Sequence, residues 1–120
     1  MHLIPKKKKK KDYGQAPNGI IGFETALAAV ITNLIKPGYI DYLDMVRLMS
    51  YRPAELLGLK TRGEISVGKM ADLTIFDSKD TYTYTEEMIV SKSKNSPWIG
   101  KRLTGSVKYT IVGGRVVYDN

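Results

Sequence analysis

The chain has 120 residues, of which 42% are hydrophobic and 26% charged, a composition typical of one small globular domain. It has no Cys and no apolar run near the roughly 18 residues of a membrane span, which excludes disulfides, thiolate metal sites and a transmembrane helix. We therefore expect a cytoplasmic protein with no membrane partner. A complete eight-stranded α/β barrel needs about 250 residues, so this chain is too short to contain one.

The net charge of +7 is concentrated near the amino terminus, where six lysines at residues 6–11 account for all but one of the net positive charges. Such a run repels itself, which predicts a disordered basic tail and connector over residues 1–15. A nucleic-acid-binding arm is the alternative, but the recognition fold or interleaved aromatic residues that accompany such arms do not follow. We therefore expect no nucleic-acid partner.

Residues 16–60 are predicted to be helical, beginning with one helix that ends at Pro37 and Gly38. Apolar side chains recur at steps of four, three and four residues, which places them on one helix face: Phe23, Leu27, Val30 and Leu34. Most other positions of this helix are also apolar or small. A helix that is apolar on all sides is normally buried, so in this chain we expect self-association or a loose, marginally stable state.

Two further helices are predicted in the same segment. Asp41 is a good N-cap, because its carboxylate can accept hydrogen bonds from the first free N–H groups of a helix. Pro53 suits the first turn of a third, short helix, since its missing N–H costs nothing there, and Gly58 suits the end of that helix.

After residue 60 the pattern changes to β-structure. Runs rich in β-branched and aromatic residues predict strands at 72–77, 81–85, 107–112 and 115–118. Gly113 and Gly114 separate the last two runs, and a two-residue hairpin turn needs the positive φ that Gly allows. The predicted fold class is therefore α+β, with four or five strands that need a covering helix or a second sheet.

The residues alone do not form a complete catalytic or metal-binding set. His2 is the single histidine, whereas a zinc site needs three or four N, S or O ligands. Gly19 and Gly22 follow no strand and precede no Gly-Lys-Ser/Thr, so they do not predict a phosphate-binding loop. The scattered aspartates suit capping and turns.

Five segments nevertheless carry family motifs in a fixed order. Residues 16–27 match Ala-Pro-x-Gly-x-x-Gly-[Leu/Phe]-Glu-Thr, and residues 50–54 match a Ser-x-x-Pro-Ala helix start. Residues 63–77 match Gly-x-Ile-x-x-Gly-x-x-Ala-Asp-Leu, and residues 91–100 match Ser-Lys-x-x-Asn-[Thr/Ser]-Pro-aromatic-x-Gly. Residues 105–114 match a closing Gly-x-Val-x-x-Thr-Ile-x-x-Gly hairpin. Together they resemble the C-terminal part of dihydroorotases, cyclic amide hydrolases of pyrimidine biosynthesis in the amidohydrolase superfamily.

The resemblance implies an incomplete α/β (TIM-type) barrel. Residues 16–60 would be its last helices, and residues 61–120 the C-terminal part of an accessory antiparallel β-sandwich domain. Asn18 and Gly19 would lie in the eighth barrel loop and offer backbone groups to the substrate, which makes them the candidate substrate-binding residues. Asn95 is expected to fix a loop of the β-domain rather than to catalyse.

The metal ligands of complete family members have no counterpart in this chain. Those members bind zinc through histidines and a carboxylated Lys or an Asp, and use a further Asp as proton shuttle. We therefore expect no catalytic residue, no cofactor and no metal in this chain, and no dihydroorotase activity when it is isolated.

Other functions and partners stay open. The chain could be a non-catalytic dihydroorotase-like assembly subunit, with aspartate carbamoyltransferase as a partner by family analogy, or a fragment of an allantoinase or hydantoinase. Gly-Phe-Glu-Thr at residues 22–25 together with Asn-Ser-Pro-Trp at residues 95–98 favours dihydroorotase. The expected partners are a second copy of the chain or a missing barrel fragment.

Residues 1–9 are predicted to be a shifted-frame translation of a dihydroorotase segment. The family typically has His-Ala-Pro-His-Ser just before the Ala-Pro-x-Gly motif, and its codons read one base later give Met-His-Leu-Ile-Pro, as in residues 1–5. An A-rich tract would then encode the lysines, and slippage there would restore the frame by Asp12. Bases upstream of Met1 that encode no barrel strand in either frame would contradict this hypothesis.

Overall fold

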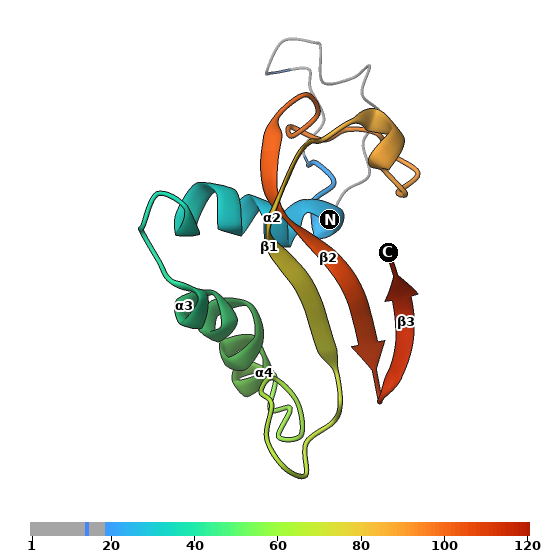
Figure 1. Ribbon diagram of the computed structural model, residues 1–120. Coiled ribbons are helices and arrows are strands. Elements are labelled where there is room, and N and C mark those ends of the chain that lie inside the picture. The colour runs from blue at the N-terminus through green and yellow to red at the C-terminus, as the bar shows by residue number, and fades with distance from the viewer. Residues whose placement is uncertain (1–13, 15–18) are drawn as a thin grey trace.

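The computed structural model of the chain describes residue 14 and residues 19–120, in which two helical stretches precede a three-stranded sheet (Figure 1). This order confirms the α+β fold class. Asn18, the predicted shifted-frame segment and the predicted basic tail, apart from Gly14, lie outside the described residues. Within the described part of the chain, no helix is long and apolar enough to cross a bilayer.

The first helix is continuous and extends over the predicted residues. Its segments are a 3-10 turn, an α-helix and a π-helical turn: η2 (Phe23–Thr25), α2 (Ala26–Val30) and η3 (Ile31–Ile35). It ends as predicted at the Pro37–Gly38 turn, where Gly38 has a φ of +89° and donates its N–H to the Ile35 carbonyl at 2.9 Å.

The second helix begins at the predicted cap. Asp41 Oδ1 accepts from the Asp44 N–H at 2.8 Å, and Asp44 Oδ2 accepts from the Asp41 N–H at 3.1 Å. This reciprocal pair satisfies two N–H groups that have no partner inside the helix. The helix then passes through an α-helical, a π-helical and a second α-helical segment: α3 (Tyr42–Val46), η4 (Arg47–Tyr51) and α4 (Arg52–Leu56).

The prediction of a separate third helix at Pro53 is wrong, because α4 continues directly from η4. Pro53 cannot donate an N–H, but it stands in the first turn after a π-helical segment, where the regular i to i−4 ladder is already interrupted. The helix therefore tolerates Pro53 without ending. The predicted end is confirmed at Gly58, which has a φ of +70°.

The sheet is antiparallel in the order β1-β2-β3, with strands β1 (Leu73–Thr83), β2 (Arg102–Val112) and β3 (Arg115–Asp119). Gly113 and Gly114 form the predicted hairpin turn, with φ values of +56° and +81°. The described residues contain three strands rather than the four or five expected.

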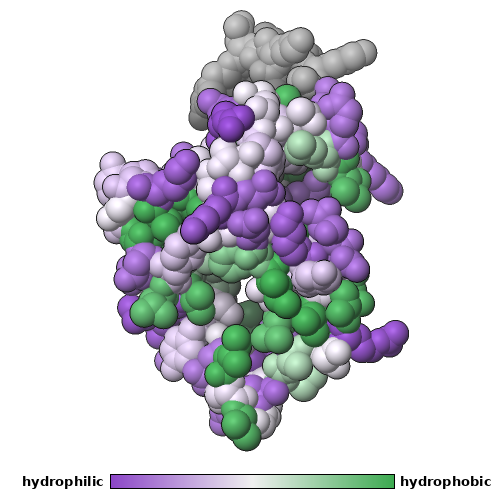
Figure 2. Space-filling view, viewed as in Figure 1, coloured by the Kyte–Doolittle hydropathy of each residue, from purple (hydrophilic) through white to green (hydrophobic). Residues whose placement is uncertain are grey.

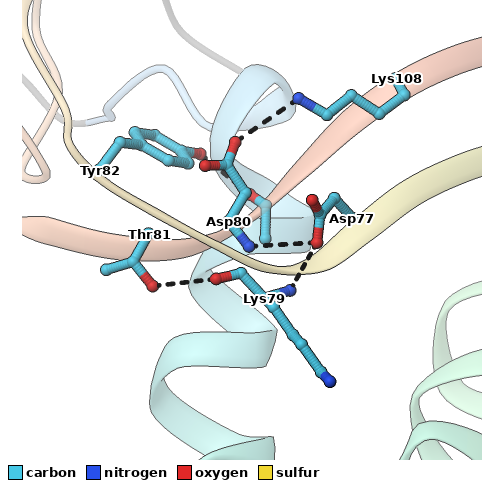
Figure 3. Close-up of polar contacts among 7 residues, drawn as sticks. Asp77, Lys79, Asp80, Thr81, Tyr82 and Lys108 are labelled. Atoms are coloured by element: carbon cyan, nitrogen blue, oxygen red, sulfur yellow. Dashed lines mark hydrogen bonds and ion pairs between the residues drawn. The ribbon is translucent and has the colours of Figure 1, made fainter.

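One correction concerns β1, which is a single strand where two were predicted. Asp77 pairs with Ser106 and Thr81 with Thr104, so three residues of β1 bulge out opposite Gly105. Figure 3 shows the Asp77 carboxylate turned toward the N–H groups of Lys79 and Asp80, which donate to it at 2.8 and 3.2 Å. The side chain replaces the missing ladder bonds, so the strand continues through a sequence that suggests a turn.

A buried cluster joins the first helix, the sheet and the long connection between β1 and β2. Its members come from all three parts: Ile21, Ala28, Tyr84, Ile89 and Leu103. The helix lies across the strands (Figure 1), and the Thr104 N–H of β2 donates to Thr32 Oγ1 at 2.8 Å. Ile31 is fully buried in this contact.

Much apolar surface away from this cluster is exposed. Figure 2 shows hydrophobic residues gathered over the lower half of the sheet, and all five residues of β3 are exposed. In the second helix, Tyr42 stacks on Phe76 of β1 with ring centroids 6.3 Å apart, while Leu43 and Leu56 are 75% and 76% exposed. Such surface is typical of an interaction site.

Candidate functional site

The candidate substrate-binding segment leads into the first helix and is held by the loop that follows β1. Asn95 Nδ2 donates to the Gly19 carbonyl at 3.3 Å, and the Ile21 N–H donates to the Asn95 carbonyl at 3.1 Å. Asn95 therefore holds the backbone on both sides of Ile20. Gly19 has a φ of +96°, a conformation that favours glycine.

Asn95 is itself fixed in this position. Its side chain is buried, with 7% exposed, and its N–H donates to Ser93 Oγ at 3.2 Å. A buried amide that satisfies its hydrogen bonds has one preferred orientation, because the alternative leaves polar groups unpaired. The expected loop-fixing role of Asn95 is thus observed, and its contact with Gly19 adds a role that sequence reasoning missed.

Glu24 forms a second connection between the same two segments. Its carboxylate accepts from the Val90 N–H at 3.1 Å, from the Ser91 N–H at 2.8 Å and from Ser91 Oγ at 2.5 Å. Lys94 lies nearby and donates to the Ile89 carbonyl at 2.8 Å. The Gly-Phe-Glu-Thr and Ser-Lys-x-x-Asn motifs are therefore joined to each other in space.

The electrostatics of Glu24 match this structural role. Burial alone would raise the pKa of its carboxyl, but the hydrogen bonds from Ser91 and Val90 and the charge of Lys94 outweigh burial and lower the pKa below its ordinary value. Glu24 is consequently ionised at neutral pH, when it serves as a hydrogen-bond acceptor.

A pocket of about 460 Å³ lies between the first helix and the sheet, lined in part by Glu24, Asp80, Tyr82, Tyr84 and Ser106. Tyr82 donates its hydroxyl to the Gly105 carbonyl at 3.0 Å, whereas the buried hydroxyls of Tyr84 and Ser106 have no partner among the described residues. Burial raises the pKa of Tyr82 and of Tyr84, and nearby carboxylates add to both shifts. Both phenols are therefore neutral at physiological pH.

A zinc ion would need three or four N, S or O ligands grouped around it. Among residue 14 and residues 19–120, no three His, Cys, Asp or Glu side chains are grouped so that they could hold a metal ion. The one histidine, His2, lies outside the described residues. The part of the chain that the structure describes thus has no donor set for zinc.

Comparison with known proteins assigns most of the chain to one family. A family model described as "Amidohydrolase family" matches residues 22–118. The dihydroorotase of Clostridium acetobutylicum is 45% identical over 115 residues, which are 96% of this chain and 27% of that protein. The dihydroorotase of Ruminiclostridium cellulolyticum is 46% identical over 109 residues, which are 91% of this chain and 25% of that protein.

Solved structures share the fold. L-hydantoinase (dihydropyrimidinase) from Arthrobacter aurescens has a TM-score of 0.86 and 33% identity, over 94% of this chain and 26% of that one. A D-hydantoinase structure has a TM-score of 0.84 and 26% identity, over 97% of this chain and 25% of that one. The chain spans about a quarter of the length of these relatives. The predicted resemblance to dihydroorotases is confirmed, and since the family model covers most of its length, the chain belongs to the amidohydrolase family.

Proposed function

We propose that this chain is the C-terminal portion of a cytoplasmic dihydroorotase, which interconverts carbamoyl-aspartate and dihydroorotate. In this proposal, residues 16–60 supply the last helices of a TIM-type barrel and residues 61–120 supply part of the accessory β-domain. One observation carries the proposal. The two motif segments that most resemble dihydroorotases are hydrogen-bonded to each other through Glu24 and Asn95.

In such an enzyme the chain contributes binding and support rather than bond cleavage. Gly19, together with Asn18 by resemblance, offers backbone groups to the cyclic amide. Zinc in complete members polarises the amide and activates water, and its ligands must come from other parts of the polypeptide. The isolated chain is therefore expected to be inactive.

The same proposal explains what would cover the exposed apolar surface. Leu43 and Leu56 of the second helix and the whole of β3 are exposed, and the matched relatives are about four times as long as the region they share with this chain. We expect the remaining polypeptide of a complete enzyme to pack on these faces. Burial of apolar surface would supply most of the free energy of that association.

Reconstitution tests the proposal. The rest of the Clostridium acetobutylicum dihydroorotase, without the quarter that matches this chain, is produced as a separate polypeptide and mixed with the chain. Each part alone should be inactive, and the mixture should hydrolyse dihydroorotate. Dihydrouracil and allantoin serve as substrate controls for the hydantoinase and allantoinase alternatives. Binding without any hydrolysis would contradict a catalytic role and favour a non-catalytic assembly subunit.

A further inference from the structure

We propose that Asn95 is a positioning residue, which fixes the Gly19–Ile20 peptide so that its N–H meets an acceptor oxygen of the bound cyclic amide. This inference rests on the proposed function, because it takes the backbone of Gly19 and Ile20 as the part that contacts the substrate. It adds Asn95, which lies 76 positions from Gly19 in the chain and would act on the substrate through the Gly19–Ile20 peptide.

The direction of the Ile20 N–H follows from the geometry of the peptide. The described residues contain no cis peptide bond, and in a trans peptide the C=O and the N–H point in opposite directions. The Gly19 carbonyl accepts from Asn95, so it points toward the loop at residues 89–100. The N–H of the same peptide, which belongs to Ile20, therefore points away from that loop.

The neighbouring groups support this orientation. The next N–H, that of Ile21, points back to the loop and donates to the Asn95 carbonyl at 3.1 Å. Ile21 is buried, whereas Ile20 is 42% exposed, so the two residues differ in burial as they differ in the direction of their N–H groups. A hydrogen bond to a peptide carbonyl also polarises that peptide, which strengthens its N–H as a donor to a carbonyl or carboxylate oxygen.

The position of Asn95 is set from both ends of its loop. At the start, Glu24 holds the N–H groups of Val90 and Ser91. At the end, the Gly100 N–H donates to the Tyr84 carbonyl at 2.8 Å, which ties the loop to the residue that follows β1. Because packing and hydrogen bonds already hold the Asn95 amide, the Gly19–Ile20 peptide is ordered before substrate binds, and binding loses less conformational entropy.

The test uses the reconstituted pair with three variants of the chain. Asn95→Asp keeps the size of the side chain but removes the donor to Gly19, and Asn95→Ala removes the whole amide. Asn33→Ala is the control, because it deletes an exposed Asn that donates only within the first helix, to the Ala29 carbonyl at 2.9 Å. The expected result is a rise in KM for dihydroorotate of about 5- to 10-fold in both Asn95 variants, with kcat changed less than about 2-fold.

A change in KM without a matching change in kcat distinguishes a positioning role of Asn95 from a role in folding alone. A residue that only supports folding changes the amount of active complex, which lowers apparent kcat and leaves KM unchanged. Amide hydrogen exchange on the isolated chain checks folding, since Ile21 should lose protection in the Asn95 variants while strand β2 keeps it. An unchanged KM in an active pair overturns the role of Asn95 and leaves the proposed function intact. An inactive wild-type pair overturns the proposed function and the inference with it.

Discussion

Gly105 allows the first helix to lie directly against the sheet. Its φ is +106°, and a Cβ at this position would lie 2.6 Å from Cδ1 of Ile31. Ile31 is fully buried, so its terminal methyl has little space into which it can move. Two separate restrictions, one on the backbone and one on packing, therefore require glycine at the centre of the contact between helix and sheet.

Replacing Gly105 by Ala should destabilise the chain by about 2–4 kcal/mol, because positive φ and overpacking each cost about 1–2 kcal/mol. Urea unfolding followed by circular dichroism measures this. Gly68→Ala is the matched control, since Gly68 has a φ of +88° but open space around its Cβ position. Gly68→Ala should lose only the part of the free energy that comes from the positive φ, about 1–2 kcal/mol. Equal losses of stability in the two variants would show that the contact between position 105 and Ile31 does not require glycine.

Glu24 should make stability depend on pH in one direction. Its folded pKa is lower than its ordinary value, so its contribution is fully present above that ordinary value and is lost as pH falls through the folded pKa. The difference in free energy of unfolding between wild type and Glu24→Gln should shrink over that range. It should stay below about 1 kcal/mol at neutral pH, because Glu24 is exposed to screening solvent.

A control separates this effect from a general loss of charge. Glu87 is also exposed, and Glu87→Gln makes the same charge change at a residue that does not bind the loop. It should alter the free energy of unfolding at neutral pH by less than about 0.5 kcal/mol. A Glu24→Gln variant as stable as wild type at neutral pH would argue against the connection to Val90 and Ser91.

At the scale of single elements, the cap at Asp41 has the clearest consequence. Asp41→Ala removes the acceptor for the Asp44 N–H, held at 2.8 Å, and should cost about 1 kcal/mol. Asp41→Asn keeps a side-chain oxygen that can accept the same hydrogen bond, so it should lower the free energy of unfolding by no more than about 0.3 kcal/mol. Thermal unfolding of the three proteins measures the order. An Ala variant equal to the Asn variant would mean that the cap contributes little.

The elements that could be predicted from the sequence are those set by neighbouring residues. The cap at Asp41 and the turn at Gly113 and Gly114 depend on a few adjacent positions, and both were found where they were expected. The bulge after Asp77 could not be predicted, because it appears only once β1 is paired with β2. The start of β2 at Arg102 was also missed, because Gly105 weakens the strand pattern and the predicted strand began only at residue 107.

The candidate site was predictable only in part for the same reason. Gly19 could be identified from its motif, but the partners that hold this segment are distant in sequence. Asn95 lies 76 residues from Gly19, and Ser91 lies 67 residues from Glu24. No local pattern encodes such contacts. The sequence offered one signal for these contacts: an acidic residue, Glu24, in the first motif and a Ser-Lys pair at residues 91–92 in the second.

At the scale of the whole molecule, exposed apolar surface should lead to self-association. The chain is elongated, measuring 51 × 30 × 29 Å, and its outer strand β3 is exposed along its full length. An exposed strand edge pairs readily with another copy. Sedimentation velocity should show the mean mass rising with concentration. Val117→Lys on β3 should reduce this rise, and a chain that stays monomeric at high concentration would contradict the prediction.

Trp98 provides an optical report on the loop that contains Asn95. It is the single tryptophan of the chain, it is partly buried, and it packs against the buried cluster that includes Ile21, Ala28 and Leu103. Its carbonyl accepts from the Lys101 N–H at 2.9 Å, so the indole moves with the end of the loop. Fluorescence excited at the red edge of the tryptophan band therefore follows this loop alone, without a label. Quenching by acrylamide can report whether the loop opens before the rest of the chain unfolds.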